Sequence, residues 1–217
     1  MIKEIALADL DTMRAAIAAG VDRVELNSRL DLGGITPDDN TVATAVKLAH
    51  DANVDLVVMV RPRGGDFDYS DAEINAMRDS LIHFRALGVK MVTFGVIDQE
   101  KRLARDRMVK LLEAAQPMQV VYHMAFDDIK PECQQQALRW LANYGVVRVL
   151  THGGDLAQPI TETVSHLKDT IAQAPAGLTI LPGGGVTFEN ASWLADELHV
   201  SELHGSKIVA LVATATL

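Results

Sequence analysis

Apolar and polar positions along the chain follow two repeating patterns. Short runs rich in β-branched residues predict strands, and most segments between them place apolar residues three and four positions apart, as a helix does. This regular alternation of strand and helix favours a parallel sheet. We expect strands at residues 3–7, 23–27, 56–61, 91–95, 119–123, 147–151, 178–181 and 201–204.

The predicted helices carry start and stop signals. Ser70 and Glu73 form a capping-box pattern before a helix. Thr36 before Pro37 has the pattern of an N-cap followed by proline at the first helical position. Glycines that lie just before a predicted strand stand where a left-handed C-cap falls. These glycines are Gly20, Gly88 and Gly145.

Eight strand–helix units in 217 residues predict one domain, residues 1–217, folded as a closed (β/α)₈ TIM barrel. The chain ends thirteen residues after His204, so we expect the eighth helix to be short or missing. A doubly wound open sheet is the alternative, but no G-x-G-x-x-G motif follows the first strand to support a dinucleotide-binding version of it.

Composition limits the partners. The net charge of −9 offers no basic surface for nucleic acid or an anionic membrane. No apolar run approaches the roughly 18 residues that cross a bilayer, and the first eleven residues lack the layout of a signal peptide. The one cysteine, Cys133, excludes an internal disulfide and fits a reducing compartment, so we expect a cytoplasmic protein.

Strand alternation predicts charged side chains inside the barrel. In residues 23–27, Val24 and Leu26 face the helices if the polar positions face inward. Three acids and three arginines occupy such inward positions, an equal count that suits a paired network. Those near strand starts are interpreted as structural, whereas those at strand ends are functional candidates. The six are Glu4, Arg23, Glu25, Arg61, Arg148 and Glu202.

The segment RPRGGDFDYSD, residues 61–71, is predicted to lie over the barrel mouth. Arg61 and Arg63 offer forked donors suited to a carboxylate or phosphate, and Arg61 is the candidate anion clamp. The alternative is a turn held by arginine pairs with Asp66 and Asp68.

Histidines at strand ends suggest acid/base chemistry. His123 and His204 end the fifth and eighth predicted strands, and an imidazole titrates near neutral pH. Asp127 is expected to orient His123 or to cap the next helix, and Glu25 is a second acid/base candidate. The alternative for His123 is a packed, hydrogen-bonded side chain.

Glycine-rich loops after the last three strands can present backbone N–H groups to a phosphate or carboxylate. The alternative is that they form tight turns alone. No Cys/His spacing or carboxylate cluster predicts a metal ligand. The candidate ligand-binding residues here are Gly153, Gly154, Gly183, Gly184, Gly185, Gly205 and Ser206.

Several segments together resemble the CutC family, named for copper homeostasis. The motifs RVELN…GGITP, RPRGGDF.YSD, YHMAFD, RVLTHGG and LPGGGVTFEN occur in the family's order over residues 3–206. The resemblance implies a TIM barrel, a cytoplasmic homo-oligomer and copper as a candidate ligand. Many CutC-like proteins carry cysteines, as suggested copper ligands, where this chain has Ala6 and Asn27, and an arginine where it has Met124.

Two functions of different class follow. One is copper handling, although copper(I) prefers the thiolates that are missing here. The other is an enzyme acting on a small phosphorylated or carboxylate substrate, with Glu25, Arg61, His123, Asp127 and His204 as its machinery. A barrel scaffold without activity is a third interpretation.

Overall fold

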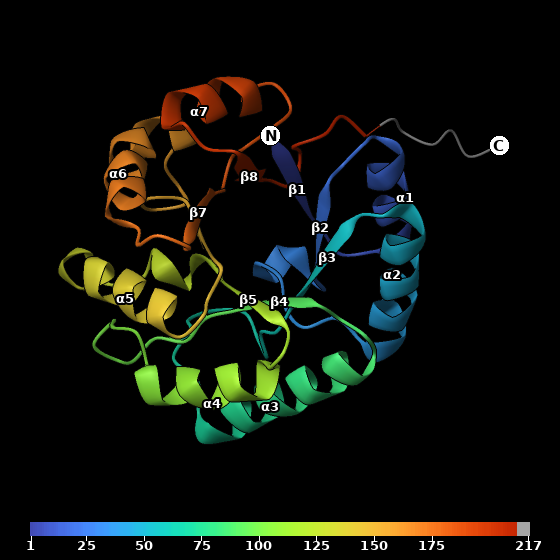
Figure 1. Ribbon diagram of the computed structural model, residues 1–217, viewed down its shortest axis with the longest axis horizontal. Coiled ribbons are helices and arrows are strands. Elements are labelled where there is room, and N and C mark those ends of the chain that lie inside the picture. Colours follow the sequence, from blue (N-terminus) through green and yellow to red (C-terminus); the bar gives the residue numbers. More distant parts are fainter. Residues whose placement is uncertain (212–217) are drawn as a thin grey trace.

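The strands form a ring of eight, as the sequence predicts. The structure is a computed structural model that describes residues 1–211. Figure 1 shows the strands at the centre, with the helices arranged around them. They pair in parallel in the order β7-β6-β5-β4-β3-β2-β1-β8, and β8 lies against β7 without a hydrogen-bonded ladder between these two strands, so the barrel is nearly closed. The strands are β1 (Ile2–Leu7), β2 (Arg23–Leu26), β3 (Asp55–Met59), β4 (Met91–Phe94), β5 (Gln119–Tyr122), β6 (Arg148–Thr151), β7 (Thr179–Pro182) and β8 (Glu202–His204).

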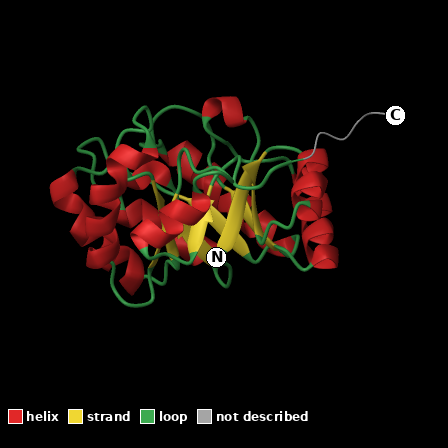
Figure 2. Cartoon of the chain, turned by 90° about the horizontal axis from the view of Figure 1, so that it is seen from above, coloured by secondary structure: helices red, strands yellow, loops and turns green. Residues whose placement is uncertain are grey.

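Helices cover the outside of this ring, and Figure 2 shows the strands enclosed between them. Two short 3₁₀ helices, η1 (Leu30–Leu32) and η2 (Met124–Phe126), lie in the loops that follow β2 and β5. The α-helices are α1 (Leu10–Ala18), α2 (Asp39–Ala52), α3 (Asp71–Ala86), α4 (Arg105–Ala115), α5 (Pro131–Asn143), α6 (Ile160–Gln173) and α7 (Ala191–Leu198).

Helix boundaries follow the sequence signals with one exception. Ser70 and Glu73 form the predicted capping box at the start of α3. The N-cap of α2 is Asp38, whose side chain accepts from the Thr41 N–H, so the prediction of Thr36 as the cap is wrong. Thr36 is engaged elsewhere, because its hydroxyl and its N–H both donate to the backbone carbonyl of Arg61 and tie this loop to the end of β3.

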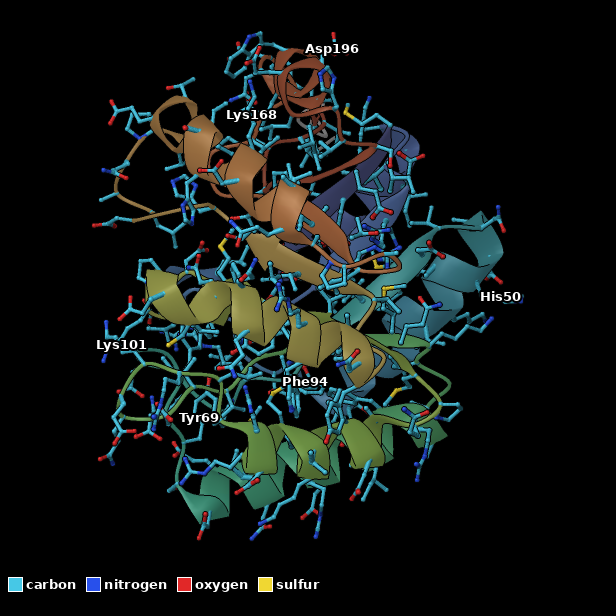
Figure 3. The ribbon with its side chains drawn as sticks, turned by 60° about the vertical axis from the view of Figure 1, so that its left-hand side comes forward. His50, Tyr69, Phe94, Lys101, Lys168 and Asp196 are labelled. Atoms are coloured by element: carbon cyan, nitrogen blue, oxygen red, sulfur yellow. The ribbon has the colours of Figure 1, made fainter. Side chains whose placement is uncertain are left out.

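The strand faces divide the core into two layers. Outward residues such as Val24, Leu26 and Leu203 belong to the large cluster between sheet and helices, as the alternation predicts. Figure 3 contrasts Phe94, inside the ring of helices, with Lys168 and Asp196 on its outer surface. A smaller apolar layer fills the barrel interior, consisting of Val57, Met91, Val121, Leu150 and Leu181.

The chain past β8 contains no helix between Gly205 and Leu211. The prediction of a short or missing eighth helix therefore agrees with the described part of the chain, while residues 212–217 lie outside it. Within residues 1–211, no helix combines the length and apolarity that crossing a bilayer requires.

Candidate functional site

The floor of the barrel is a lattice of paired charges. Arg23 donates through Nε to Glu4 and through Nη2 to Glu202 Oε2 at 2.6 Å. Glu202 Oε2 also accepts from Arg148 Nε at 2.7 Å. All four side chains point inward as predicted, and two arginines face two carboxylates. The structural role expected for Arg23, Arg148 and Glu202 therefore accounts for their contacts.

Above this lattice, His204 links the floor to the mouth. Its Nδ1 lies 2.7 Å from Glu4 Oε1. Burial alone would raise the pKa of Glu4, but the hydrogen bond from His204 and the charges of His204 and Arg23 lower the pKa to about 2. Burial alone would lower the pKa of His204, whereas the negative charges of Glu25 and Glu4 raise the pKa above its usual value. Glu4 is thus an anion that favours a protonated His204.

Within residues 1–211, the Glu25 carboxyl group has no cationic hydrogen-bond partner. Its Oε1 accepts from Asn27 Nδ2 at 3.0 Å, and its Oε2 is buried without a partner in the described chain. Burial, and then the negative charge of Glu4, raise the pKa of Glu25, although His204 opposes the shift. Ligand atoms of Glu4, Glu25 and His204 lie within 4.8 Å of one another, close enough to bind one cation together.

A cavity of about 160 Å³ lies directly above these groups at the carboxyl ends of the strands. Four of the five predicted catalytic residues line this cavity, together with several apolar side chains. The structure thus brings strand-end residues from β2, β3, β5 and β8 to one space. The lining includes Ala6, Glu25, Asn27, Leu30, Met59, Arg61, Phe67, His123, Met124, Leu150 and His204.

His123 faces this cavity as a neutral donor. Its Nδ1 accepts the Ala125 N–H at 3.2 Å, so the proton of the neutral ring is on Nε2, which is buried without a partner in residues 1–211. Burial, and then the charge of Arg61, lower the pKa of His123 to about 3. A Cβ at Gly95 would lie 2.8 Å from His123 Nδ1, so glycine there leaves room for the ring.

Arg61 holds loops together with most of its donors. Nη1 lies 3.1 Å from the Gly33 carbonyl and 3.2 Å from that of Gly34, and Nη2 lies 2.7 Å from the Gly65 carbonyl. The guanidinium stacks on Phe67 at 4.6 Å. Only Nε is left without a partner among the described residues. The fork expected to clamp an anion is therefore turned toward the β2–α2 and β3–α3 loops, although Arg61 is among the residues that line the cavity.

Arg63 lies in the loop network and is not among the cavity-lining residues. It donates to Glu73 at 2.6 Å and to Asp66 at 3.0 Å, next to the start of α3. Asp68 pairs with Arg107 at 2.9 Å. The alternative interpretation, a turn held by arginine–aspartate pairs, thus describes Arg63 and Asp66, while Arg61 has neither aspartate as a partner in the described chain.

Asp127 also has a structural set of contacts. Its carboxylate accepts from the N–H groups of His152 and Gly153 at 2.9 and 3.0 Å, and from the Thr151 hydroxyl. Burial raises its pKa, and these hydrogen bonds oppose the rise. In residues 1–211 no hydrogen bond joins Asp127 to His123, so Asp127 fastens the β5 loop to the β6 loop and does not orient the imidazole.

The glycine-rich loops have part of their N–H groups occupied within the protein. Gly183 N donates to Thr151 O, Gly205 N to Glu4 O, and Gly153 N to Asp127. Gly184 and Gly185 adopt φ values of +78° and +83°, which the predicted tight turn requires. Gly154 lies against Thr163, and Ser206 is exposed. None of these seven residues is among those that line the cavity.

Sequence reasoning missed several residues around the mouth. Phe67 packs against both Arg61 and His123, with 4.8 Å between the Phe67 and His123 ring centroids. His152 is buried, and its Nδ1 lies 3.0 Å from the Gly184 carbonyl, which fixes the β7 loop. The signal for His152 was available, because it directly follows a strand as His123 does. Phe67 carried no comparable signal in its spacing.

The fold and the site define a (β/α)₈ barrel with one small, partly charged cavity at its mouth. Comparison with known proteins gives the family. The CutC family matches residues 1–209. Curated relatives named family protein CutC include one from Enterococcus faecalis, 38% identical over 96% of this chain and 100% of its own length. Another, from Streptococcus pyogenes, is 40% identical with the same coverage. The chain belongs to the CutC family.

A solved structure supports the same conclusion. The CutC protein from Streptococcus agalactiae superposes with a TM-score of 0.93 at 31% identity, covering 96% of this chain and 100% of its own. That protein is provisionally described as a copper homeostasis protein. The resemblance noted from the motifs and the barrel fold are both confirmed.

Proposed function

We propose that this CutC-family chain binds a small organic molecule in the mouth cavity and moves a proton on it. The observation that carries the proposal is a set of four buried polar atoms with no partner in residues 1–211, on four residues lining one cavity: Glu25 Oε2, Asn27 Oδ1, Arg61 Nε and His123 Nε2. Unpaired buried polar groups destabilise a fold, so their gathering at one cavity favours a ligand that completes their hydrogen bonds.

Three of these groups, those of Glu25, His123 and Arg61, have complementary roles. Burial raises the pKa of Glu25, which makes its carboxylate a stronger base for accepting and returning a proton. His123 donates a hydrogen bond from Nε2 while staying neutral, and Arg61 supplies a second donor from Nε. His204 supports Glu25 from below, because a protonated imidazole stabilises the ionised carboxylate. Asp127 and Arg63 act through the loops and have no direct part in this proposal.

A panel of small carboxylates, phosphates and aldehydes tests the proposal by thermal shift. Binding compounds are expected to raise the melting temperature of the wild type and of Glu197→Gln, a surface control, but less that of Glu25→Gln. Equal shifts for all three proteins, or none with any compound, would remove Glu25 from a binding role.

Copper handling is the second candidate function. Its support is the description of the S. agalactiae relative, together with the thioethers of Met59 and Met124, which line the same cavity as Ala6 and Asn27. Copper(I) prefers thiolate and thioether ligands. Against it, the tautomer of His123 presents N–H to the cavity and not a lone pair.

Copper(I) titration against a competing chelator separates the two functions. A copper site in the cavity predicts weaker binding in the double variant Met59→Leu, Met124→Leu and unchanged binding in Met108→Leu, a buried control in α4. Wild-type affinity equal to that of the double variant would exclude these thioethers as ligands.

We also propose that the chain self-associates in the cytoplasm, as the family resemblance implies. Exposed Phe188 and Trp193, at 53% and 45%, are large apolar side chains near α7 that suit a contact between copies. Light scattering after size-exclusion chromatography measures this, and a 23.5 kDa monomer at all concentrations would contradict it.

A further inference from the structure

One buried positive charge at the mouth has no negative partner. The Arg61 side chain is only 5% exposed, and its terminal nitrogens contact backbone carbonyls. No carboxylate oxygen of residues 1–211 lies within 4.0 Å of its guanidinium. The two arginines of the floor pair with two carboxylates, whereas Arg61 has no such pair. A ligand with a single negative charge neutralises Arg61.

The size of the cavity limits that ligand further. Its volume is about 160 Å³. An apolar cavity of about 150 Å³ accommodates benzene, which has six heavy atoms. A sugar phosphate is much larger, whereas a carboxylate of three or four carbons fits. The sequence leaves open a phosphorylated or a carboxylate substrate, and the size of the cavity favours the carboxylate.

The hydrogen-bond donors at the mouth favour a ligand that has an acceptor oxygen close to the position from which Glu25 takes a proton. His123 Nε2–H and Arg61 Nε–H belong to side chains packed on the same ring, Phe67. A neutral imidazole stabilises a developing oxyanion by donating a hydrogen bond. Glu25 Oε2 is free to take a proton from the same ligand. A carbonyl oxygen beside an acidic C–H satisfies both requirements.

Building on the proposed function, we infer that the substrate is a 2-oxo monocarboxylate of three or four carbons, and that the protein enolises it. Its carboxylate neutralises Arg61, and its 2-oxo oxygen accepts from His123 Nε2–H. Glu25 Oε2 removes a proton from C3: the C–H electron pair forms the C2–C3 double bond, and the carbonyl π pair moves onto oxygen. Return of a proton from Glu25 restores the keto form, so no co-reactant is consumed.

Exchange of the methyl protons of pyruvate in D₂O, followed by proton NMR, tests the inference. The wild type is expected to accelerate the exchange, and Glu25→Gln to slow it about 100-fold or more, because a positioned base contributes at least that factor. His123→Leu is expected to lose about 100-fold by removing the oxyanion donor. Glu197→Gln, the same change on the surface, retains the wild-type rate.

The outcomes distinguish this inference from the broader proposal. Pyruvate exchange that is no faster with wild type than with Glu25→Gln overturns the 2-oxo acid assignment. If 2-phosphoglycolate or glycolaldehyde then shows thermal shifts that depend on Glu25, the proposed function stands with another substrate class. If neither does, and copper(I) alone binds through Met59 and Met124, both the enolisation and the proton-transfer function are wrong.

Discussion

The floor and the mouth of this barrel bury the same kinds of side chain in opposite ways. On the floor, Arg23, Arg148, Glu4 and Glu202 bind one another, and within residues 1–211 Arg23 Nη1 alone among their side-chain atoms is buried without a partner. At the mouth, Glu25 and His123 each keep one polar atom without a partner in the described chain. Paired charges at the strand starts maintain the fold, whereas unpaired groups at the strand ends remain available to a ligand.

The largest expected effect comes from breaking the floor. Arg23→Met removes one partner from each of two buried carboxylates and is expected to destabilise the protein by about 3–5 kcal/mol. Urea unfolding measures this, with Arg29→Met as control, because Arg29 and Asp31 form an exposed pair that contributes little to stability. A loss for Arg23→Met no larger than that of the control would contradict a structural lattice.

The alternation of residues within strands made the floor predictable. Val24 and Leu26 had to face the helices, which placed Arg23 and Glu25 inside. The uses of Arg61 and Asp127 could not be read from the sequence, because they depend on loop carbonyls and N–H groups that approach only after folding. Thr36 was misassigned for the same reason. Its hydrogen bonds are made to Arg61, 25 residues away in the sequence, so Thr36 is not available to cap α2. The tautomer of His123 likewise depends on the local turn at Ala125.

A second variant examines the boundary between the two regions. Arg61→Met keeps a long apolar stem over Phe67 but removes the donors to the loop carbonyls, so we expect a loss of about 2–3 kcal/mol. Amide hydrogen exchange should accelerate most in residues 28–36, because Arg61 binds backbone carbonyls of this loop. Arg78→Met, on the surface of α3, serves as the matched control. Unchanged protection of residues 28–36 would mean that Arg61 does not hold this loop.

The pH dependence of stability isolates His123. The pKa of His123 is about 3 in the folded protein, against 6.5 for a free histidine side chain. Between these values the unfolded chain binds a proton at this residue that the folded chain does not, so the folded state loses stability as pH falls from 6.5 to 3. The contribution is about 1.4 kcal/mol per pH unit.

Comparison with His123→Gln reveals this contribution, because the other titrating groups remain in both proteins. Urea unfolding at a series of pH values should give a steeper loss of stability for the wild type than for the variant between pH 6 and pH 4. Parallel curves would show that His123 is protonated in the folded state and therefore cannot be the neutral donor.

The smallest expected effect has the opposite sign to that of Arg23→Met. The pKa of Glu25 is raised by burial and by the charge of Glu4, so its ionised form at pH 7 opposes folding, and the stability that a protonated Glu25 provides is lost as pH rises. Glu25→Gln keeps an oxygen for the Asn27 hydrogen bond and removes the charge, so we expect stability to be unchanged or to rise by about 1 kcal/mol at pH 7.

The same variant is expected to lose pyruvate exchange, and stability gained with activity lost is typical of a functional residue. A loss of more than about 2 kcal/mol in urea unfolding would instead place Glu25 in the structural lattice with Glu4, since removing one partner of a buried ion pair destabilises strongly.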